Sequence, residues 1–298
     1  MPVNHTADAN NASLNASLIF ICPAQPKVVA SLANFFVEHE VDIANFREFS
    51  ADECLFVRLE WALGEQWQDE AAFALAFKAF AESHSAFFNV RFLNRKLSVG
   101  LFVGSDSRSL VEFINHYYIH GGNSALTIPF VMGRDNAVRS VVDRYGLPFF
   151  HVGIDSSCPD SVRDHEFKQL EIINRYKPDY LAMANYDGVI SSEFINAINC
   201  PMISVRRMFM PEFSGENAFE QAHRRGVKLV GATAYFASGE SMCGPILEQD
   251  TVSLNGDISL SGLIEKSHEL EQQVFVNAMM SVLEHKVVTY NKRTVSFN

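Results

Sequence analysis

The sequence has few cysteines, no long basic run and no long apolar run. Five cysteines are an odd number, and their wide spacing without a CxxC pair argues against a disulfide framework or a zinc site and favours a reducing cytoplasm. The formal net charge of −11 and the absence of a basic stripe argue against nucleic-acid binding. No apolar run reaches the roughly 18 residues that a membrane-spanning helix needs. The cysteines are Cys22, Cys54, Cys158, Cys200 and Cys243.

What remains is the composition of a globular protein with room for two domains. Of the 298 residues, 48% are hydrophobic and 20% are charged, as is usual for folded soluble chains. Residues 1–16 are rich in Asn, Ala and Ser and lack the basic start and apolar core of a signal peptide. We therefore expect a disordered tail at 1–16, a first domain at 17–93 and a second domain at 94–298.

The first domain is predicted to alternate strands and helices in the order β-α-β-β-α-β. Apolar runs predict strands at Ser17–Cys22, Ile43–Phe49, Cys54–Trp61 and Phe87–Leu93. Apolar residues at helical spacing predict a helix that opens at Gln25 and Pro26 and another over Trp67–Ser83. A turn is expected at Ser50–Asp52. This order is the split βαβ arrangement of ferredoxin-like modules, to which the small regulatory ACT domains belong.

The second domain is predicted to be a mostly parallel α/β sheet with helices on both faces, because strands and helices alternate along it. Two later runs are expected to close the sheet as an antiparallel pair, and a long amphipathic helix precedes a short final strand. The predicted strands are Leu97–Val103, Ile128–Met132, Pro148–Val152, Tyr180–Ala184, Met202–Val205, Val227–Phe236, Ile246–Leu254 and Val287–Tyr290, and the long helix is Ile258–Leu283.

In such sheets ligands bind beyond the carboxyl ends of the strands. The loops after Met132, Ala184 and Val205 are therefore the expected site. The residues there that we interpret as ligand-binding candidates are Gly133, Tyr186, Asp187, Arg206 and Arg207.

Several blocks of residues, in order and at consistent spacing, resemble those of 10-formyltetrahydrofolate deformylase. The resemblance covers about Leu18 to the C-terminus and implies an ACT-like module followed by a Rossmann-like formyltransferase domain. It also suggests a folate ligand and a homo-oligomer. The matching blocks are Ile21–Pro23, Arg139–Tyr145, Lys177–Tyr180, Phe209–Phe213, Gln221–Lys228 and Gly231–Ala234.

The resemblance places the family's catalytic residues at positions that hold other side chains in this chain. The family's Asn corresponds to Ser204, its His to Arg206 and its Asp to Met242. In the family, these residues handle the proton of the attacking water and stabilise charge on the formyl oxygen. These roles are general acid–base catalysis and oxyanion stabilisation. Methionine cannot accept a proton, and arginine stays protonated. Hydrolysis by the family mechanism is therefore not expected.

Three functions remain open: a ligand-binding or regulatory homologue, an enzyme with remade acyl or formyl chemistry, and a residual hydrolase that releases formate. Arg206 and Arg207 could bind a carboxylate or phosphate, or form salt bridges with Asp187, Glu216 or Glu220. Cys243 could be a nucleophile or a small buried apolar residue.

The phenylalanines are expected in the core or at a dimer interface. His116 and His120 are four residues apart but lack further ligands, so no metal is predicted. The expected partner is a small folate, anionic or acylated metabolite rather than nucleic acid or membrane.

Overall fold

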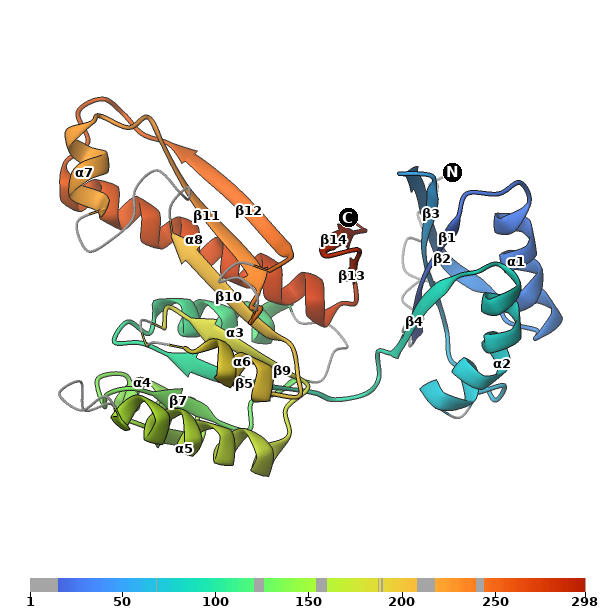
Figure 1. The fold of residues 1–298 in the computed structure, drawn as a ribbon, viewed down its shortest axis with the longest axis horizontal. Coiled ribbons are helices and arrows are strands. Elements are labelled where there is room, and N and C mark those ends of the chain that lie inside the picture. Colours follow the sequence, from blue (N-terminus) through green and yellow to red (C-terminus); the bar gives the residue numbers. More distant parts are fainter. Residues whose placement is uncertain are drawn as a thin grey trace, which may run out of the picture.

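The computed structural model describes residues 16–67, 69–120, 126–153, 160–186, 188, 190–207, 218–239 and 244–297. It divides into two packed parts, an N-terminal module and a larger α/β domain (Figure 1). Residues 1–15 of the predicted tail, Asp187, Met242 and Cys243 lie outside the described residues. The predicted tail boundary is wrong at Ala16, which is buried as the first residue of β1. None of the described helices is long and apolar enough to cross a membrane.

The N-terminal module has the predicted ferredoxin-like order, with an antiparallel sheet in the strand order β2-β3-β1-β4. Its elements are β1 (Ala16–Pro23), α1 (Val28–Glu38), β2 (Ile43–Ala51), β3 (Cys54–Trp61), α2 (Glu70–Ser83) and β4 (Phe87–Phe92). Helix α2 begins where the Asp69 side chain accepts a hydrogen bond from Ala72 N at 2.8 Å, which satisfies a free amide of the first turn. Aromatic rings fill the space between the helices and the sheet, among them Phe20, Phe36, Trp61, Phe73 and Phe77.

The turn between β2 and β3 lies later than predicted. Strand β2 continues through Ala51, and the turn is made by Asp52 and Glu53, with φ of 50° and 60°. Positive φ at both central residues is the conformation that two-residue hairpins favour, because its twist matches that of the strands. The predicted turn at Ser50–Asp52 is therefore wrong by two residues, because the strand propensity was interpreted as ending too early.

The second domain is built on a sheet in the strand order β12-β11-β10-β9-β5-β7-β8, with β6 paired to β5. Strands β5, β7, β8, β9 and β10 run parallel, and β11 and β12 close the sheet as the predicted antiparallel pair. The strands are β5 (Leu97–Val103), β6 (Leu126–Thr127), β7 (Val131–Gly133), β8 (Phe149–His151), β9 (Tyr180–Ala184), β10 (Met202–Arg207), β11 (Leu229–Phe236) and β12 (Ile246–Ser253).

Helices cover both faces of this sheet, as predicted. The long helix α8 packs with α3 and α4 against one face, and α5 and α6 pack against the other (Figure 1). Strand β10 is longer than predicted and includes both arginines. The helices are α3 (Arg108–His120), α4 (Arg139–Arg144), α5 (Asp160–Tyr176), α6 (Ser192–Ala197), α7 (Ala218–Arg224) and α8 (Leu260–Leu283).

The two parts dock through the open face of the N-terminal sheet. A hairpin of β13 (Val287–Tyr290) and β14 (Arg293–Ser296), the second strand of which was not predicted, packs against Ile19, Ile21 and Phe56. Arg58 donates to His285 O at 2.8 Å and to Glu284 O at 3.0 Å. Because the last carbonyls of a helix lack partners within it and carry partial negative charge, this arginine satisfies the end of α8.

Candidate functional site

The topology places the candidate site beyond the carboxyl ends of β5 and β9. These neighbouring strands run parallel, but the chain continues from β5 to β7 on one side and returns through α5 to β9 on the other. In sheets of this kind, ligands bind where the strand order reverses in this way. Strand β10 lies beside β9 and carries the two arginines at its end.

Strand geometry sends the two arginines of β10 to opposite faces of the sheet. Arg206 pairs with Thr233 and Arg207 with Ala232 across an antiparallel ladder to β11. Because successive side chains in a strand point to opposite faces, Arg206 shares its face with Ser204, and Arg207 shares its face with Val205. The side chain of Val205 packs against the core under α8. Arg207 therefore faces α8, and Arg206 faces away from it.

The side chain of Arg206 makes no hydrogen bond or ion pair with any residue that the structure describes. Its guanidinium carbon lies 5.9 Å from the centre of the Tyr235 ring, within range of a cation–π interaction. Tyr235 is the strand partner of Ser204, which is 5% exposed. On the same face, Gln249 Nε2 donates to Thr233 Oγ1 at 2.8 Å. This face thus presents a fixed cation beside hydroxyl and amide groups.

Arg207, in contrast, is held by three residues. Its Nε lies 3.2 Å from Glu271 Oε2, and its Nη1 lies 2.8 Å from His268 Nε2. Its Nη2 donates to Asn185 Oδ1 at 3.3 Å, and its guanidinium carbon is 5.8 Å from the centre of the Phe219 ring. The charge of Arg207 is therefore used to join the ends of β9 and β10 to α8.

The partner of Arg207 on α8 is a buried carboxyl group. Burial raises the pKa of Glu271 to about 7, although the nearby Arg207 opposes the rise. The oxygen that faces Arg207 is within ion-pair distance but lacks a hydrogen bond of good geometry, so its desolvation is only partly offset. Glu271 is consequently a group that exchanges a proton near neutral pH.

His268 is the second α8 residue in this network. Burial, and then the charges of Arg207 and Arg108, lower its pKa. A neutral imidazole can accept the hydrogen bond that Arg207 offers. On its other side, His268 Nδ1 lies 3.7 Å from Asp106 Oδ2.

Asp106 connects the network to the loop after β5. It accepts from Arg108 N at 2.9 Å, and Arg108 Nη1 continues to Glu265 Oε1 on α8 at 3.0 Å. Although burial acts to raise the pKa of Asp106, hydrogen bonds from Arg108 lower it below its usual value. The sequence analysis missed Asp106, His268 and Glu271. The signal for the last two was a His and a Glu three residues apart on the long amphipathic helix, and hence on one helix face.

Two other predicted residues are engaged in packing. The Tyr186 hydroxyl lies 3.1 Å from His165 Nε2 and 3.1 Å from Gln169 Nε2, on the α5 side of the sheet. A Cβ at Gly133 would come within 2.8 Å of the Phe149 ring, so glycine permits the close contact between β7 and β8. The structure does not bring either residue together with Arg206, and their role in ligand binding stays a prediction.

The described residues contain no group of three His, Cys, Asp or Glu side chains that could hold a metal ion. His116, one of the predicted pair, is half-buried on α3. The described part of the site therefore offers arginine charge, hydroxyl groups and the Glu271–His268 pair as its chemistry.

Comparisons with known proteins agree with this architecture. A family model described as formyl transferase matches residues 104–279. The formyltetrahydrofolate deformylase of Synechocystis sp. is 28% identical over 290 residues, which cover 96% of this chain and 99% of the relative. That of Bacillus subtilis is 27% identical over 284 residues, covering 94% of this chain and 93% of the relative.

Solved structures show the same fold. A formyltetrahydrofolate deformylase from Pseudomonas syringae superposes with a TM-score of 0.85 at 24% identity, covering 95% of this chain and 94% of that chain. A glycinamide ribonucleotide transformylase from Symbiobacterium toebii, at 21% identity, covers 70% of this chain and 98% of its own, with a TM-score of 0.59. The first of these structures thus matches both parts of the fold.

Proposed function

The chain belongs to the formyl transferase family, and from this premise we propose that it binds a folate or another small anionic metabolite of one-carbon metabolism without hydrolysing formyltetrahydrofolate by the family mechanism. The observation that carries the proposal is the guanidinium of Arg206, which lies beside Ser204 and has no anionic partner among the described residues.

The residues at the family's catalytic positions support the loss of hydrolysis. The resemblance aligns Ser204, Arg206 and Met242 with the family's Asn, His and Asp. Hydrolysis requires a group that takes a proton from the attacking water. A guanidinium and a thioether cannot do this, because the first holds its protons and the second is only a weak acceptor. A serine hydroxyl at 204 still offers a hydrogen bond, but a hydroxyl is not itself a base and does not activate water.

The same residues support retained binding. A guanidinium forms two parallel hydrogen bonds to a carboxylate or phosphate, and folates carry carboxylates on their glutamate moiety. Arg206 has no internal anion among the described residues to compete for these bonds. Its position on β10, held in register by β11, keeps the charge in place before a ligand arrives, which reduces the ordering cost of binding.

The test measures turnover and binding in the same protein. The purified chain is incubated with 10-formyltetrahydrofolate, and formate release is followed beside calorimetric binding of 5-formyltetrahydrofolate. We expect no protein-dependent formate and a folate affinity that Arg206→Gln weakens about tenfold or more, the value of a charge-assisted hydrogen bond. Arg144→Gln, at an exposed arginine on α4, is the control and should leave affinity unchanged. Protein-dependent formate release that Arg206→Gln abolishes would falsify the proposal.

One observation favours a second function, an enzyme with remade acid–base chemistry. Glu271 and His268 lie within 3.9 Å of each other, and burial brings the pKa of Glu271 to about 7, which suits proton transfer at neutral pH. In the same assay, formate release that survives Arg206→Gln but is lost in Glu271→Gln would support this function. Loss in neither variant would contradict it.

A further inference from the structure

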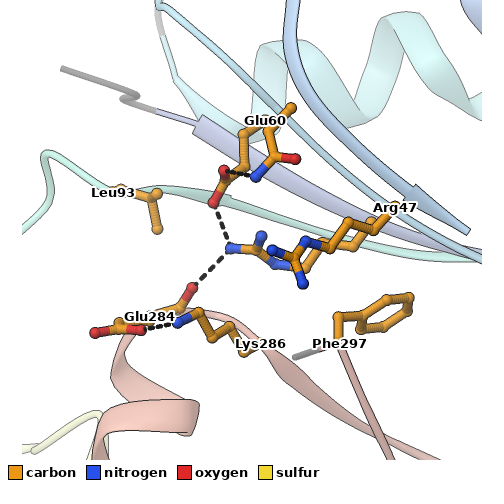
Figure 2. A pocket seen from close by; sticks show the side chains of 8 residues that line it. Arg47, Glu60, Leu93, Glu284, Lys286 and Phe297 are labelled. Carbon is orange, nitrogen blue, oxygen red and sulfur yellow. Dashed lines mark hydrogen bonds and ion pairs between the residues drawn. The ribbon is translucent and has the colours of Figure 1, made fainter. Parts of the chain in front are cut away.

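A cavity of about 340 Å³ lies between the N-terminal module and the end of α8, and none of its lining residues belongs to β10 (Figure 2). Its volume is at the lower end of the range for small-molecule pockets. Strands β2 and β3 supply one wall, and the segment after α8 supplies the other. The lining residues are Asn45, Arg47, Arg58, Glu60, Leu93, Glu284, Lys286 and Phe297.

Two arginines face each other across the sheet at this cavity. Arg47 on β2 is the direct strand partner of Arg58 on β3, and both arginines line the cavity. Like charges directly opposite in an antiparallel pair destabilise a sheet. Such an arrangement calls for negative charge nearby.

The carboxylates that line the cavity neutralise only part of this positive charge. Arg58 forms an ion pair with Glu60 Oε1 at 2.5 Å and donates hydrogen bonds to the two carbonyls at the end of α8. Glu60 also accepts from Asn45 Nδ2 at 3.0 Å, and Glu284 pairs with Lys286 at 2.5 Å. Three cations, Arg47, Arg58 and Lys286, thus stand against two carboxylates.

The cation in excess is Arg47. Unlike Arg58 and Lys286, it has no hydrogen bond or ion pair with any described residue. It is exposed on the sheet, and its side chain extends along the cavity toward Phe297 (Figure 2). An incoming anion at this position would complete the charge balance.

We propose that this interdomain cavity binds a small organic anion, a carboxylate or a phosphate ester, through Arg47 and Lys286. Its apolar part lies against Leu93 and Phe297. Arg47 belongs to the N-terminal module and Lys286 follows α8, so the complete site exists only while the two parts are docked. By mass action the anion stabilises the docked arrangement.

The experiment uses the full chain, with inorganic phosphate and succinate as probes and calorimetry at low ionic strength. At least one probe should bind, and Arg47→Gln should weaken that binding about tenfold or more. Which probe binds distinguishes phosphate esters from carboxylates. Arg144→Gln controls for the loss of one surface charge. Because Arg206 is also proposed to bind anions, the titrations are repeated in Arg206→Gln, where the probe binding that remains, and that Arg47→Gln then weakens, belongs to this cavity and not to the proposed folate site.

A second variant and a second measurement exclude a folding defect. Lys286→Gln, on the opposite wall, should also weaken binding. Trypsin cleavage at Arg95 and Lys96, in the exposed connection between the two parts, should slow when the bound probe is present, and this protection should disappear in Arg47→Gln. The proposal is overturned if neither probe binds at a concentration of about 10 mM, at which even a weak site with a millimolar dissociation constant would be occupied. It is also overturned if Arg47→Gln and Arg144→Gln bind the probe alike.

Discussion

Arg206 and Arg207 are neighbours in sequence, yet they occupy two different environments. Arg207 is joined to Glu271, His268 and Asn185 on the α8 face. Arg206 lies over Tyr235 on the other face without an anion among the described residues. The comparison teaches that a pair of adjacent charges need not act together, because strand alternation joins one to α8 and turns the other to the opposite face of the sheet.

The largest expected loss of stability comes from removing the ion pair between Arg207 and Glu271 on α8. Arg207→Met leaves the buried Glu271 without its cation, and loss of one partner of a buried pair costs about 3 to 5 kcal/mol. The free energy of unfolding at pH 8, where Glu271 is ionised, should fall by this amount in urea titrations. The double variant Arg207→Met with Glu271→Leu should recover most of the loss, because apolar residues can replace a buried pair. A single variant as stable as the parent would mean that the ion pair contributes nothing.

A smaller effect concerns the proton on Glu271. Its pKa in the folded chain, about 7, lies above its ordinary value of 4.5, so the folded state holds the proton more tightly. Glu271 therefore adds to the free energy of unfolding below about pH 4.5, and this contribution is lost as the pH rises through about 7. The loss should amount to about 2 to 3 kcal/mol. Urea titrations from pH 5 to 8 should show this fall in the parent and not in Glu271→Gln.

His268 titrates beside Glu271 and needs its own control. Its pKa is lowered in the folded chain, so it makes stability rise with pH toward its ordinary value of 6.5. Because His268 Nδ1 lies 3.9 Å from Glu271 Oε2, the two groups titrate as a pair, and the comparison is repeated in a His268→Gln background. Parallel curves in that background would show that Glu271 carries no raised pKa.

The smallest expected effect on stability comes from replacing Arg206, on the opposite face of the sheet. Arg206→Gln removes only a cation–π contact with Tyr235, so the free energy of unfolding should change by less than about 1 kcal/mol. Differential scanning calorimetry would compare the stability of Arg206→Gln with that of Arg207→Met. A loss as large as that of Arg207→Met would show that Arg206 is a structural residue and not a free ligand-binding group.

Much of the fold could be predicted because its signals are local. The apolar runs at Leu97–Val103 and Tyr180–Ala184 coincide with β5 and β9, and Cys54–Trp61 coincides with β3. Strand β14 was missed, because its sequence Arg293–Ser296 has little apolar character. It becomes a strand by pairing with β13, while Val295 packs into the cluster on the N-terminal sheet.

The candidate site was predicted less completely. Ser204, Arg206 and Arg207 were identified as departures from a family pattern, but their expected acidic partners were Asp187, Glu216 and Glu220. Asp187 and Glu216 lie outside the described residues, and among those described Arg207 pairs with Glu271, 64 positions away in a helix that the sequence analysis treated only as amphipathic. Pairing over such a separation depends on how α8 crosses the sheet, and no local pattern encodes it.

The sequence by itself determined the order of the elements, the two-part architecture and the side chains at positions 204, 206 and 242, none of which is a general base, because these follow from side-chain chemistry and short-range periodicity. Only the tertiary structure decided which arginine is free. The ladder to β11 keeps both arginines in β10 and sends them to opposite faces, and the packing of α8 brings a buried carboxylate to just one of them.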